Sequence, residues 1–312
     1  MVELVALGAL AMDAAIGWPG RLHARVGHPV GGFARIIAAC ERRWNRPAFG
    51  RTRRRLGGVA TLLLLLAVSG ASGWGGEALI RESMGRWAWV GIAIAAWPAL
   101  AQRSLFDHVT PVVRALEAGD LPVARRAVGR IVGRDIAALD EAGVARAGIE
   151  SLAESFCDGI VAPLFWLLVG GLPGVWAYKA VNTADSLIGH REEPFGPFGW
   201  AAARCDDLMN LLPARFSGLL LCIAAGGGWR VMWRDHARHA SPNGGWPEAA
   251  MAGGLRVRLA GPVRYDGVLH DKPWIGGEGC DATAREGRTA IAIYLRACAL
   301  LWVATLLGEL SR

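Results

Sequence analysis

Long runs without a charged residue constrain this chain more than any other feature of its sequence. Residues 56–76 form an uncharged run of 21, and residues 159–178 form one of 20. A helix of about 20 apolar residues is long enough to cross the hydrocarbon core of a bilayer. Hydrophobic residues make up 53% of the chain. We therefore predict an all-α, polytopic integral membrane protein with polar helical loops between the spans.

Other apolar segments extend this interpretation. Residues 1–18 contain only two acidic residues, residues 87–102 form an uncharged run of 16, and residues 289–308 are interrupted only by Arg296. Because no basic residue precedes it, the first segment is expected to be a membrane helix and not a cleaved signal peptide. We expect one membrane-embedded domain over residues 1–312, with N-terminal spans in 1–102, a core motif region in 103–233, a polar loop in 234–288 and a C-terminal span in 289–312.

Two apolar segments are expected to be broken or re-entrant. Residues 216–229 form an uncharged run of only 14, which is too short for a complete span. Residues 159–178 contain Pro163 and Pro173, and proline interrupts the hydrogen bonding of a helix. Irregular backbone is tolerated at membrane depth where it is buried in protein or lines a cavity. We predict that these two segments do not both cross the membrane completely.

The distribution of arginine predicts the orientation of the chain. Its net charge is +7, with Lys179 and Lys272 as the only lysines, and residues 21–55 hold ten Arg against one acid, Glu41. Loops rich in basic residues stay on the cytoplasmic side. The sequence therefore predicts a multi-pass protein of the cytoplasmic membrane with residues 21–55 inside. Because the arginines flank apolar runs, lipid is the expected contact and nucleic-acid binding is disfavoured.

One stripe of charged residues stands beside an apolar run. Arg146, Glu150, Glu154 and Asp158 are spaced by four, so they lie on one face of a helix. Like charges at this spacing repel by a few tenths of a kcal/mol on an exposed helix, and by more where water is scarce. A bound cation would turn this repulsion into attraction. We expect that neutralising Glu150, Asp158 or the later Asp207 lowers activity without lowering stability.

Two more polar clusters follow the stripe. In the first, Asn182 and Asp185 are three residues apart and share a helical face. In the second, the adjacent Asp206 and Asp207 stand near Asn210. Carboxylate and amide oxygens are the ligands that Mg²⁺ prefers, although an aspartate pair that caps a helix would look the same. The residues are Lys179, Asn182 and Asp185, and then Arg204, Asp206, Asp207, Asn210 and Arg215.

Three further features of the sequence are weaker signals of function or structure. The run SPNGGWPEAA at residues 241–250 predicts a turn, and the backbone N–H groups at Ser241 and Asn243 could hold a phosphate or a carboxylate. Asp13 is either a functional group at membrane depth or an interfacial residue. Asp120 predicts a helix start, after which Arg126, Arg130 and Arg134 would form one face. A solvated basic face is favoured there over an anion site.

Common catalytic motifs are absent from the sequence. It has no phosphate-binding G-x-x-x-x-G-K-[ST] loop and no G-x-S-x-G nucleophile elbow. The six Cys form no C-x-x-C pair, so neither a zinc site nor a disulfide framework is indicated. The run DGIVAP has Pro163 where membrane phosphoalcohol transferases have Arg, which disfavours that family.

Four runs together resemble the membrane-bound adenosylcobinamide-phosphate synthase (cobinamide synthase) family of cobalamin biosynthesis. They are AGIESLAES followed by DGIVAPLFW, YKAVNTADSLIGH, ARCDDLMNLLPAR and SPNGGWPEAAMAG. Asp13, Pro19 and the run His28-Pro29-Val30 fit the family's opening. The chain departs from the family pattern at Ser155, where Asn is usual, and at His190, where Tyr is usual.

The resemblance implies that a carboxylate of adenosylcobyric acid is joined to aminopropanol or its O-phosphate in an amide bond, with ATP and Mg²⁺. Such chemistry needs a base, cations and a metal. The expected catalytic acids are Glu150, Glu154, Asp158, Asp185 and Asp207, and the expected metal ligands are Asp206, Asp207 and Glu150. The expected cofactor- and substrate-binding residues are His28, Arg146, Lys179, Asn182, Arg204, Asn210, Arg215, Ser241 and Asn243.

Alternatives stay open at this point. A transporter would also use intramembrane carboxylates and broken helices, but it predicts similar halves, and no internal repeat is visible. A non-catalytic membrane sensor would not need so many paired polar residues. Residues 179–215 contain four basic residues and residues 230–288 contain nine. By the positive-inside rule, this difference favours residues 179–215 on the outer side of the membrane. A site that uses ATP must face the cytoplasm, and we give this argument more weight. The chain could also be an oligomer.

Overall fold

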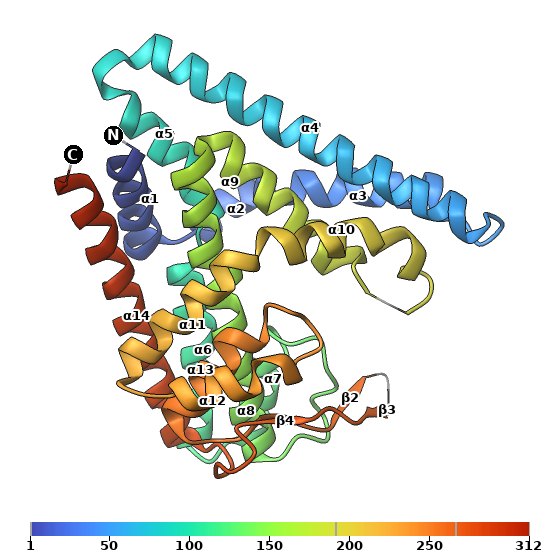
Figure 1. The fold of residues 1–312 in the computed structure, drawn as a ribbon, viewed down its shortest axis with the longest axis vertical. Coiled ribbons are helices and arrows are strands. Elements are labelled where there is room, and N and C mark those ends of the chain that lie inside the picture. Colours follow the sequence, from blue (N-terminus) through green and yellow to red (C-terminus); the bar gives the residue numbers. More distant parts are fainter. Residues whose placement is uncertain (1, 191, 266, 312) are drawn as a thin grey trace. The chain divides into compact units, whose positions relative to one another are not determined.

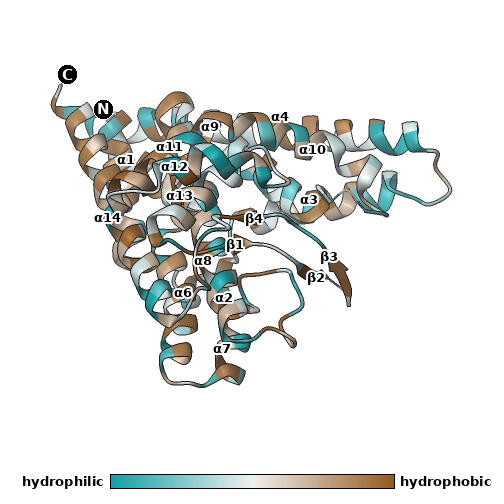
Figure 2. Cartoon of the chain, turned by 60° about the horizontal axis from the view of Figure 1, so that its bottom comes forward, coloured by the Kyte–Doolittle hydropathy of each residue, from teal (hydrophilic) through white to brown (hydrophobic). Residues whose placement is uncertain are grey.

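The computed structural model describes residues 2–190, 192–265 and 267–311, and it confirms the predicted helical membrane class (Figure 1). Within these residues, three helical segments are long and apolar enough to span a membrane: Arg51–Glu117, Glu141–Ile188 and Ala284–Leu310. Two bent helix pairs would bring the number to five. One of them joins Val2–Ile16 to Gly20–Val26 at 106°. Hydrophobic residues follow much of the last segment (Figure 2).

The helices fall into two compact units, which we treat separately. Unit 1 comprises Met1–Ala101, Ala162–Asn210 and Thr305–Arg312, and unit 2 comprises Gln102–Val161 and Leu211–Ala304. The helices of unit 1 are α1 (Val2–Ile16), α2 (Gly20–Val26), α3 (Val30–Trp44), α4 (Arg51–Met84), η1 (Gly85–Trp87), α5 (Ala88–Ala96), η2 (Trp97–Ala99), α9 (Ala162–Ile188) and α10 (Gly196–Met209).

In unit 1, the long helix α4 lies along both α9 and α10 (Figure 1). Small residues on α4 make this close approach possible. A Cβ atom at Gly73 would lie 2.7 Å from the backbone nitrogen of Pro173, and one at Gly58 would overlap the backbone of Phe198. The position of α9 and α10, which carry the polar residues of unit 1, therefore depends on glycines of α4.

Helix α9 is broken in its middle, as expected for this apolar run. Gly171 has φ 59° and ψ −152°, and Pro173 follows it. The N–H of Leu172 is left without a helical partner and instead donates to Glu77 Oε2 of α4 at 3.0 Å. Pro163 causes no such break because it lies in the first turn of α9, directly after a π-helical turn.

Unit 2 consists of helices and a few short strands. They are α6 (Gln102–Glu117), α7 (Leu121–Val128), α8 (Glu141–Phe156), the π-helical turn η3 (Cys157–Val161), α11 (Leu211–Ala225), α12 (Trp229–Asp235), η4 (His236–Arg238), α13 (Gly245–Leu255), β1 (Leu259–Ala260), β2 (Val263–Tyr265), β3 (Val268–His270), β4 (Trp274–Ile275) and most of α14 (Ala284–Leu310). Strand β1 pairs with β4 and β2 with β3, both antiparallel.

Helix α13 is buried, although it lies in the segment that the sequence indicated to be a polar loop. It packs against α11, α12 and α8, and its Ala and Gly residues allow these close contacts. The apolar run 216–229 is interrupted, as expected. Helix α11 ends at Ala225, Gly226 and Gly228 adopt positive φ angles of 67° and 94°, and α12 begins at Trp229.

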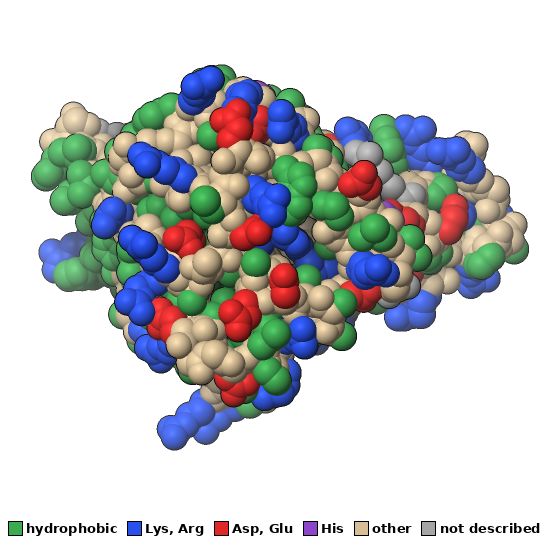
Figure 3. Space-filling model, turned by 90° about the horizontal axis from the view of Figure 1, so that it is seen from below, with side chains coloured by type: hydrophobic (Ala, Val, Ile, Leu, Met, Phe, Trp, Pro, Cys, Tyr) green, Lys and Arg blue, Asp and Glu red, His purple; other side chains and the backbone are tan. Residues whose placement is uncertain are grey.

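The helix predicted after Asp120 is shorter than the arginine spacing implied. Asp120 does cap α7, because its side chain accepts the Val123 N–H at 3.0 Å. However, α7 ends at Val128 with Gly129 as its cap, so Arg130 and Arg134 lie outside it and the predicted basic face does not form. The face of the molecule in Figure 3 carries basic and acidic side chains interspersed.

Candidate functional site

The buried carboxylate of Asp206 is the centre of a polar network in unit 1. Its side chain, on α10, accepts hydrogen bonds from Asn182 Nδ2 at 3.3 Å and from Asn210 Nδ2 at 3.0 Å. The Tyr178 hydroxyl donates to Asn210 Oδ1 at 3.1 Å, and Lys179 Nζ donates to Asn182 Oδ1 at 3.4 Å. Four residues predicted from the sequence are thus joined, and Tyr178, which we took only as the end of an apolar run, joins them.

Other predicted residues surround this Asp206 network. Arg204 and Asp207, both on α10, form an ion pair of 3.2 Å. Asp185 on α9 is within electrostatic range of Arg204 and of both α10 aspartates. His28 precedes α3, and burial together with the charge of Lys179 lowers the pKa of its imidazole. Unit 1 therefore holds one continuous group of acidic, amide and basic side chains.

A pocket rich in arginine opens beside the same helices of unit 1. It has a volume of about 570 Å³, and its lining includes Arg51, Arg54, His190, Trp200 and Arg204. Arg54 is only 9% exposed and donates to Asn45 Oδ1 and Glu193 Oε2, both at 2.8 Å. We call this cavity the arginine pocket. The sequence signal for it was the run of arginines at 51–55, which we interpreted only as a flank of a membrane span.

Gly189 connects the arginine pocket to the acidic group. It lines the pocket, and a Cβ atom there would lie 2.8 Å from Asp185 Cγ. Only glycine leaves room for the carboxylate at this wall. A ligand in the pocket would therefore meet arginines and the carboxylate of Glu193, with Asp185 directly behind Gly189.

In unit 2, Glu150 on α8 is fully engaged. It is 3% exposed, and its carboxylate pairs with Arg134, accepts the Ala260 N–H at 2.7 Å and lies 3.8 Å from Arg146 Nε. The Arg146 guanidinium also lies over the ring of Trp274, 4.9 Å from its centroid. Glu150 thus links α8 to the segment of β1.

The next acid of the stripe, Glu154, meets two residues from other elements. His239 Nε2 lies 3.5 Å from Glu154 Oε1 and 3.7 Å from Glu248 Oε1. Glu248, on α13, is 3% exposed, and burial, reinforced by the charges of Glu154 and Glu150, raises the pKa of its carboxyl well above its ordinary value. We call these three residues the Glu–His–Glu cluster. Glu154 was predicted from its spacing, but its two partners were not, since the three residues come from three separate elements.

The turn that precedes α13 holds the histidine of this cluster. The Ser241 N–H donates to His239 Nδ1 at 3.1 Å, and Ser241 Oγ accepts the N–H groups of Asn243 and Gly244 at 3.2 and 3.4 Å. These backbone donors, which we expected to hold an anion, are thus directed at a side chain of the turn itself.

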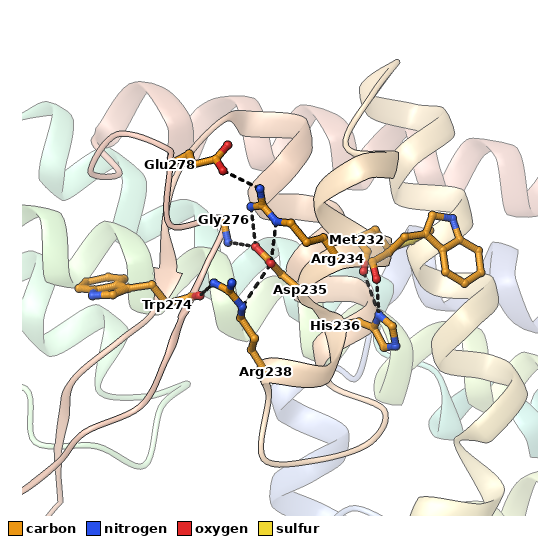
Figure 4. Close-up of polar contacts among 9 residues, drawn as sticks. Met232, Arg234, Asp235, His236, Arg238, Trp274, Gly276 and Glu278 are labelled. Carbon is orange, nitrogen blue, oxygen red and sulfur yellow. Dashed lines mark hydrogen bonds and ion pairs between the residues drawn. The ribbon is translucent and has the colours of Figure 1, made fainter.

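An ionic network anchors the chain just before His239 (Figure 4). The buried Asp235 carboxylate accepts hydrogen bonds from Arg234 at 2.8 and 2.9 Å and from the Gly276 N–H at 2.9 Å. Arg238 pairs with Asp235 at 3.3 Å and donates to the Trp274 carbonyl at 2.9 Å. The segment is thereby fixed to β4.

Two predicted residues of unit 2 lie outside these groups. Arg215 stacks over Trp246, 4.8 Å from the ring centroid, and donates to the Leu211 carbonyl. Asp158 is half-buried in the π-helical turn η3, so the winding of the helix changes between Glu154 and Asp158. Single π turns inside helices are frequent at functional sites.

Comparison with known proteins now adds to this geometry. The family model described as CobD/Cbib protein matches residues 6–294. A protein of Rhodobacter capsulatus named "Cobalamin biosynthesis protein CobD" is 49% identical over 300 residues, which cover 93% of this chain and 92% of the relative. A protein of the same name from Rhizobium meliloti (strain 1021) is 43% identical over 313 residues, or 96% of this chain and 94% of the relative. No solved structure matches. The chain belongs to the CobD/CbiB family of cobalamin biosynthesis proteins.

Proposed function

We propose that this protein forms an amide bond between a carboxylate of adenosylcobyric acid and aminopropanol or its O-phosphate, at the expense of ATP. Its membership of the CobD/CbiB family, over nearly its whole length, is the observation that carries the proposal. The apolar helices would hold it in the cytoplasmic membrane, with the site open to the cytoplasm where ATP is available.

The arginine pocket of unit 1 is the best candidate for the phosphate groups of this reaction. A carboxylate does not react with an amine until it is activated, and ATP bound with Mg²⁺ supplies that activation. Planar guanidinium groups bind phosphate and carboxylate oxygens in pairs, and Arg51, Arg54 and Arg204 line the cavity of about 570 Å³. Its size and its donors fit a polyphosphate or the phosphate of the amine.

The oxygen donors beside the pocket support the magnesium part of the proposal. Asp206 and Asp207 are adjacent on α10, and the amide of Asn182 already contacts the first of them. Hard cations take carboxylate and amide oxygens, so these residues would hold the ion. In unit 2, Glu150 would act by holding Arg134 and Arg146 in place.

Asp185 is our candidate for the base. The amine arrives as an ammonium ion and must lose a proton before its nitrogen can attack. Asp185 is half-buried and lies against Gly189, which lines the pocket. Its carboxylate would accept that proton, while Arg204 and Lys179 would orient negatively charged groups of the substrates.

The proposal is tested with protein purified in detergent and supplied with adenosylcobyric acid, ATP, Mg²⁺ and each of the two amines. We expect amide product, detected by mass spectrometry, and one ADP per product. Asp185→Asn should lower the rate by about 100-fold or more, as loss of a general base does. Arg204→Gln should weaken substrate binding. Arg126→Gln, at an exposed arginine of α7, should change neither the rate nor substrate binding.

Two results would contradict the proposal. If neither amine gives an amide product, the proposed synthase activity is wrong. Movement of a corrinoid across proteoliposome membranes without any product would instead support a transporter.

A further inference from the structure

The three side chains of the Glu–His–Glu cluster converge on a single point in unit 2. Glu154 comes from α8, His239 follows η4, and Glu248 comes from α13. One ligand atom of each residue lies within 4.8 Å of the others. Convergence of two carboxylates and one imidazole from three elements is the arrangement in which protein metal sites are built.

The spacing of these atoms matches metal ligation better than hydrogen bonding. A charge-assisted hydrogen bond between an imidazole and a carboxylate is about 2.7–2.9 Å long, whereas the distances here are 3.5 and 3.7 Å. Two ligand atoms that are each about 2.1 Å from a tetrahedral ion lie about 3.4 Å apart. The cluster therefore leaves room for an ion between its members.

Glu248 supplies a second, independent indication. Its Oε2 atom is buried and has no hydrogen-bond partner among the described residues. Burial of a carboxyl oxygen without a hydrogen-bond partner is costly, and Glu154 brings a second carboxyl group into the same cluster. A divalent cation would offset both effects.

The turn residue Gly244 leaves the space that the cluster needs. A Cβ atom at this position would lie 2.9 Å from Glu154 Oε1 and 2.8 Å from His239 Cε1. Any other residue would therefore press against two of the three side chains. The Asp235 network holds the preceding segment, so the imidazole is presented from a fixed backbone (Figure 4).

The donor set indicates which ion would bind. Mg²⁺ prefers oxygen ligands and keeps several waters, whereas imidazole suits Zn²⁺ and other transition metals. Ligation through His239 Nε2 requires the proton on Nδ1, so ion binding would exchange the hydrogen bond from the Ser241 N–H to Nδ1, 3.1 Å long, for donation from Nδ1 to the Ser241 carbonyl at 3.4 Å. Metal-bound histidines usually donate their second N–H to such an acceptor.

We propose that Glu154, His239 and Glu248 bind one divalent transition-metal ion, Zn²⁺ or Mn²⁺, with ligands other than those proposed for magnesium in unit 1. Three protein ligands leave a fourth position for water or a substrate oxygen, as in catalytic zinc sites. Glu154 is 45% exposed in its side chain, so this position is reachable from solvent. The inference rests on the geometry of the cluster and does not require the proposed synthase activity.

The test measures the ion itself. Protein purified in detergent is stripped with a chelator, loaded with Zn²⁺ or Mn²⁺ and freed of excess ion, and the bound metal is measured by mass spectrometry. We expect about one ion per chain. His239→Gln and Glu248→Gln should each weaken binding by more than the 10–100-fold that is typical of outer-shell changes. Gly244→Ala should weaken it as well.

Matched controls use residues of the same unit outside the cluster. His236→Gln and Glu278→Gln remove a nearby imidazole and an exposed carboxylate, and neither should change the metal content. If the cluster variants do not fold, the unaltered protein loaded with Mn²⁺ still decides, because its magnetic resonance spectrum should show coupling to one imidazole nitrogen.

Two outcomes would overturn the inference. An ion content near zero in the unaltered protein would mean that the cluster shares a proton and not a metal. Full metal content in both His239→Gln and Glu248→Gln would place the ion elsewhere. A protein that binds the ion but makes no amide would contradict only the proposed function, because binding is measured without ATP or corrinoid.

Discussion

Glu150 is surrounded by cations, and this reverses what its neighbouring acids suggested. In the sequence Glu150 stands four residues from Glu154, so its neutralisation was expected to reduce the repulsion between the two carboxylates. In the structure its carboxylate meets Arg134, Arg146 and the N–H of Ala260. Attraction to two guanidinium groups and a hydrogen bond outweigh one like charge a full helical turn away. The expectation that its neutralisation spares stability is therefore abandoned.

We predict that Glu150→Gln lowers the free energy of unfolding by about 3 kcal/mol, because it removes the buried carboxylate that pairs with Arg134 and Arg146. Thermal unfolding in detergent measures this effect. Glu154→Gln is the matched control on the same helix face, and in metal-free protein it should shift the melting temperature little. A level or higher melting temperature for Glu150→Gln would show that the ion pair contributes nothing.

The residues of unit 1 show how far local spacing predicts a site. Asn182, Asp206 and Asn210 were singled out because carboxylates and amides recur at helical spacing, and they do contact each other. Spacing could not predict His239 and Glu248, since these two residues meet Glu154 only after three elements have packed. The arginine pocket was missed for a similar reason, because Arg204 joins Arg51 and Arg54 from a distant helix.

At the scale of elements, uncharged runs predicted the helices well and their ends poorly. The run at residues 56–76 became part of α4, which extends from Arg51 to Met84, because charged residues continue a helix beyond the membrane as readily as apolar ones. The four short strands were not predicted. Each has only two or three residues, which is too few for an alternating pattern to be recognised.

The contact between α4 and α9 gives a test of helix packing. Gly73→Ala should destabilise the protein by about 1–3 kcal/mol, since its Cβ would lie 2.7 Å from Pro173 N and the core must shift. Gly75→Ala is the control on the same helix, where a Cβ atom would meet no heavy atom of the described residues within 4 Å apart from its chain neighbours and the backbone of its own helix. It should be neutral or stabilising, because alanine favours helix by about 1 kcal/mol over glycine. Equal melting temperatures for the two variants would contradict the close approach.

The hydrogen bonds to Asp235, the last residue of α12, give a prediction about pH. Hydrogen bonds from Arg234 lower the pKa of the Asp235 carboxyl. A carboxyl with a lowered folded-state pKa stabilises the protein above its unfolded-state pKa of about 3.9, and this contribution is lost as the pH falls through the folded value. Asp235→Asn should therefore lower the melting temperature at pH 7, and the difference from the unaltered protein should shrink below about pH 4. A difference that stays constant with pH would exclude a role for the charge.

At the scale of the whole molecule, the apolar helices make this a multi-pass membrane protein, and its orientation is a separate question. By the positive-inside rule, the ten-to-one excess of Arg in residues 21–55 predicts that this segment lies inside the cell. The arginine pocket includes Arg51 and Arg54, so the same orientation would give it access to cytoplasmic ATP.

A cysteine at position 50 tests this orientation. Gly50→Cys is made together with Cys280→Ser, which removes an exposed native thiol. We expect a membrane-impermeant maleimide to leave residue 50 unlabelled in intact cells and to label it after the cells are opened. A permeant maleimide should label it in both. Labelling of intact cells by the impermeant reagent would place residues 21–55 outside.

The break in α9 has a consequence for how the chain is made. The Leu172 N–H is accepted by Glu77 of α4 and not by its own helix, so the second half of α9 cannot complete its backbone bonding in isolation. A ribosome delivers Glu77 95 residues before Leu172, so the acceptor is already in the nascent protein when its donor emerges. The order of synthesis thus matches the order in which the two helices depend on each other, and a permuted chain that began at residue 162 would have to insert α9 before its acceptor existed.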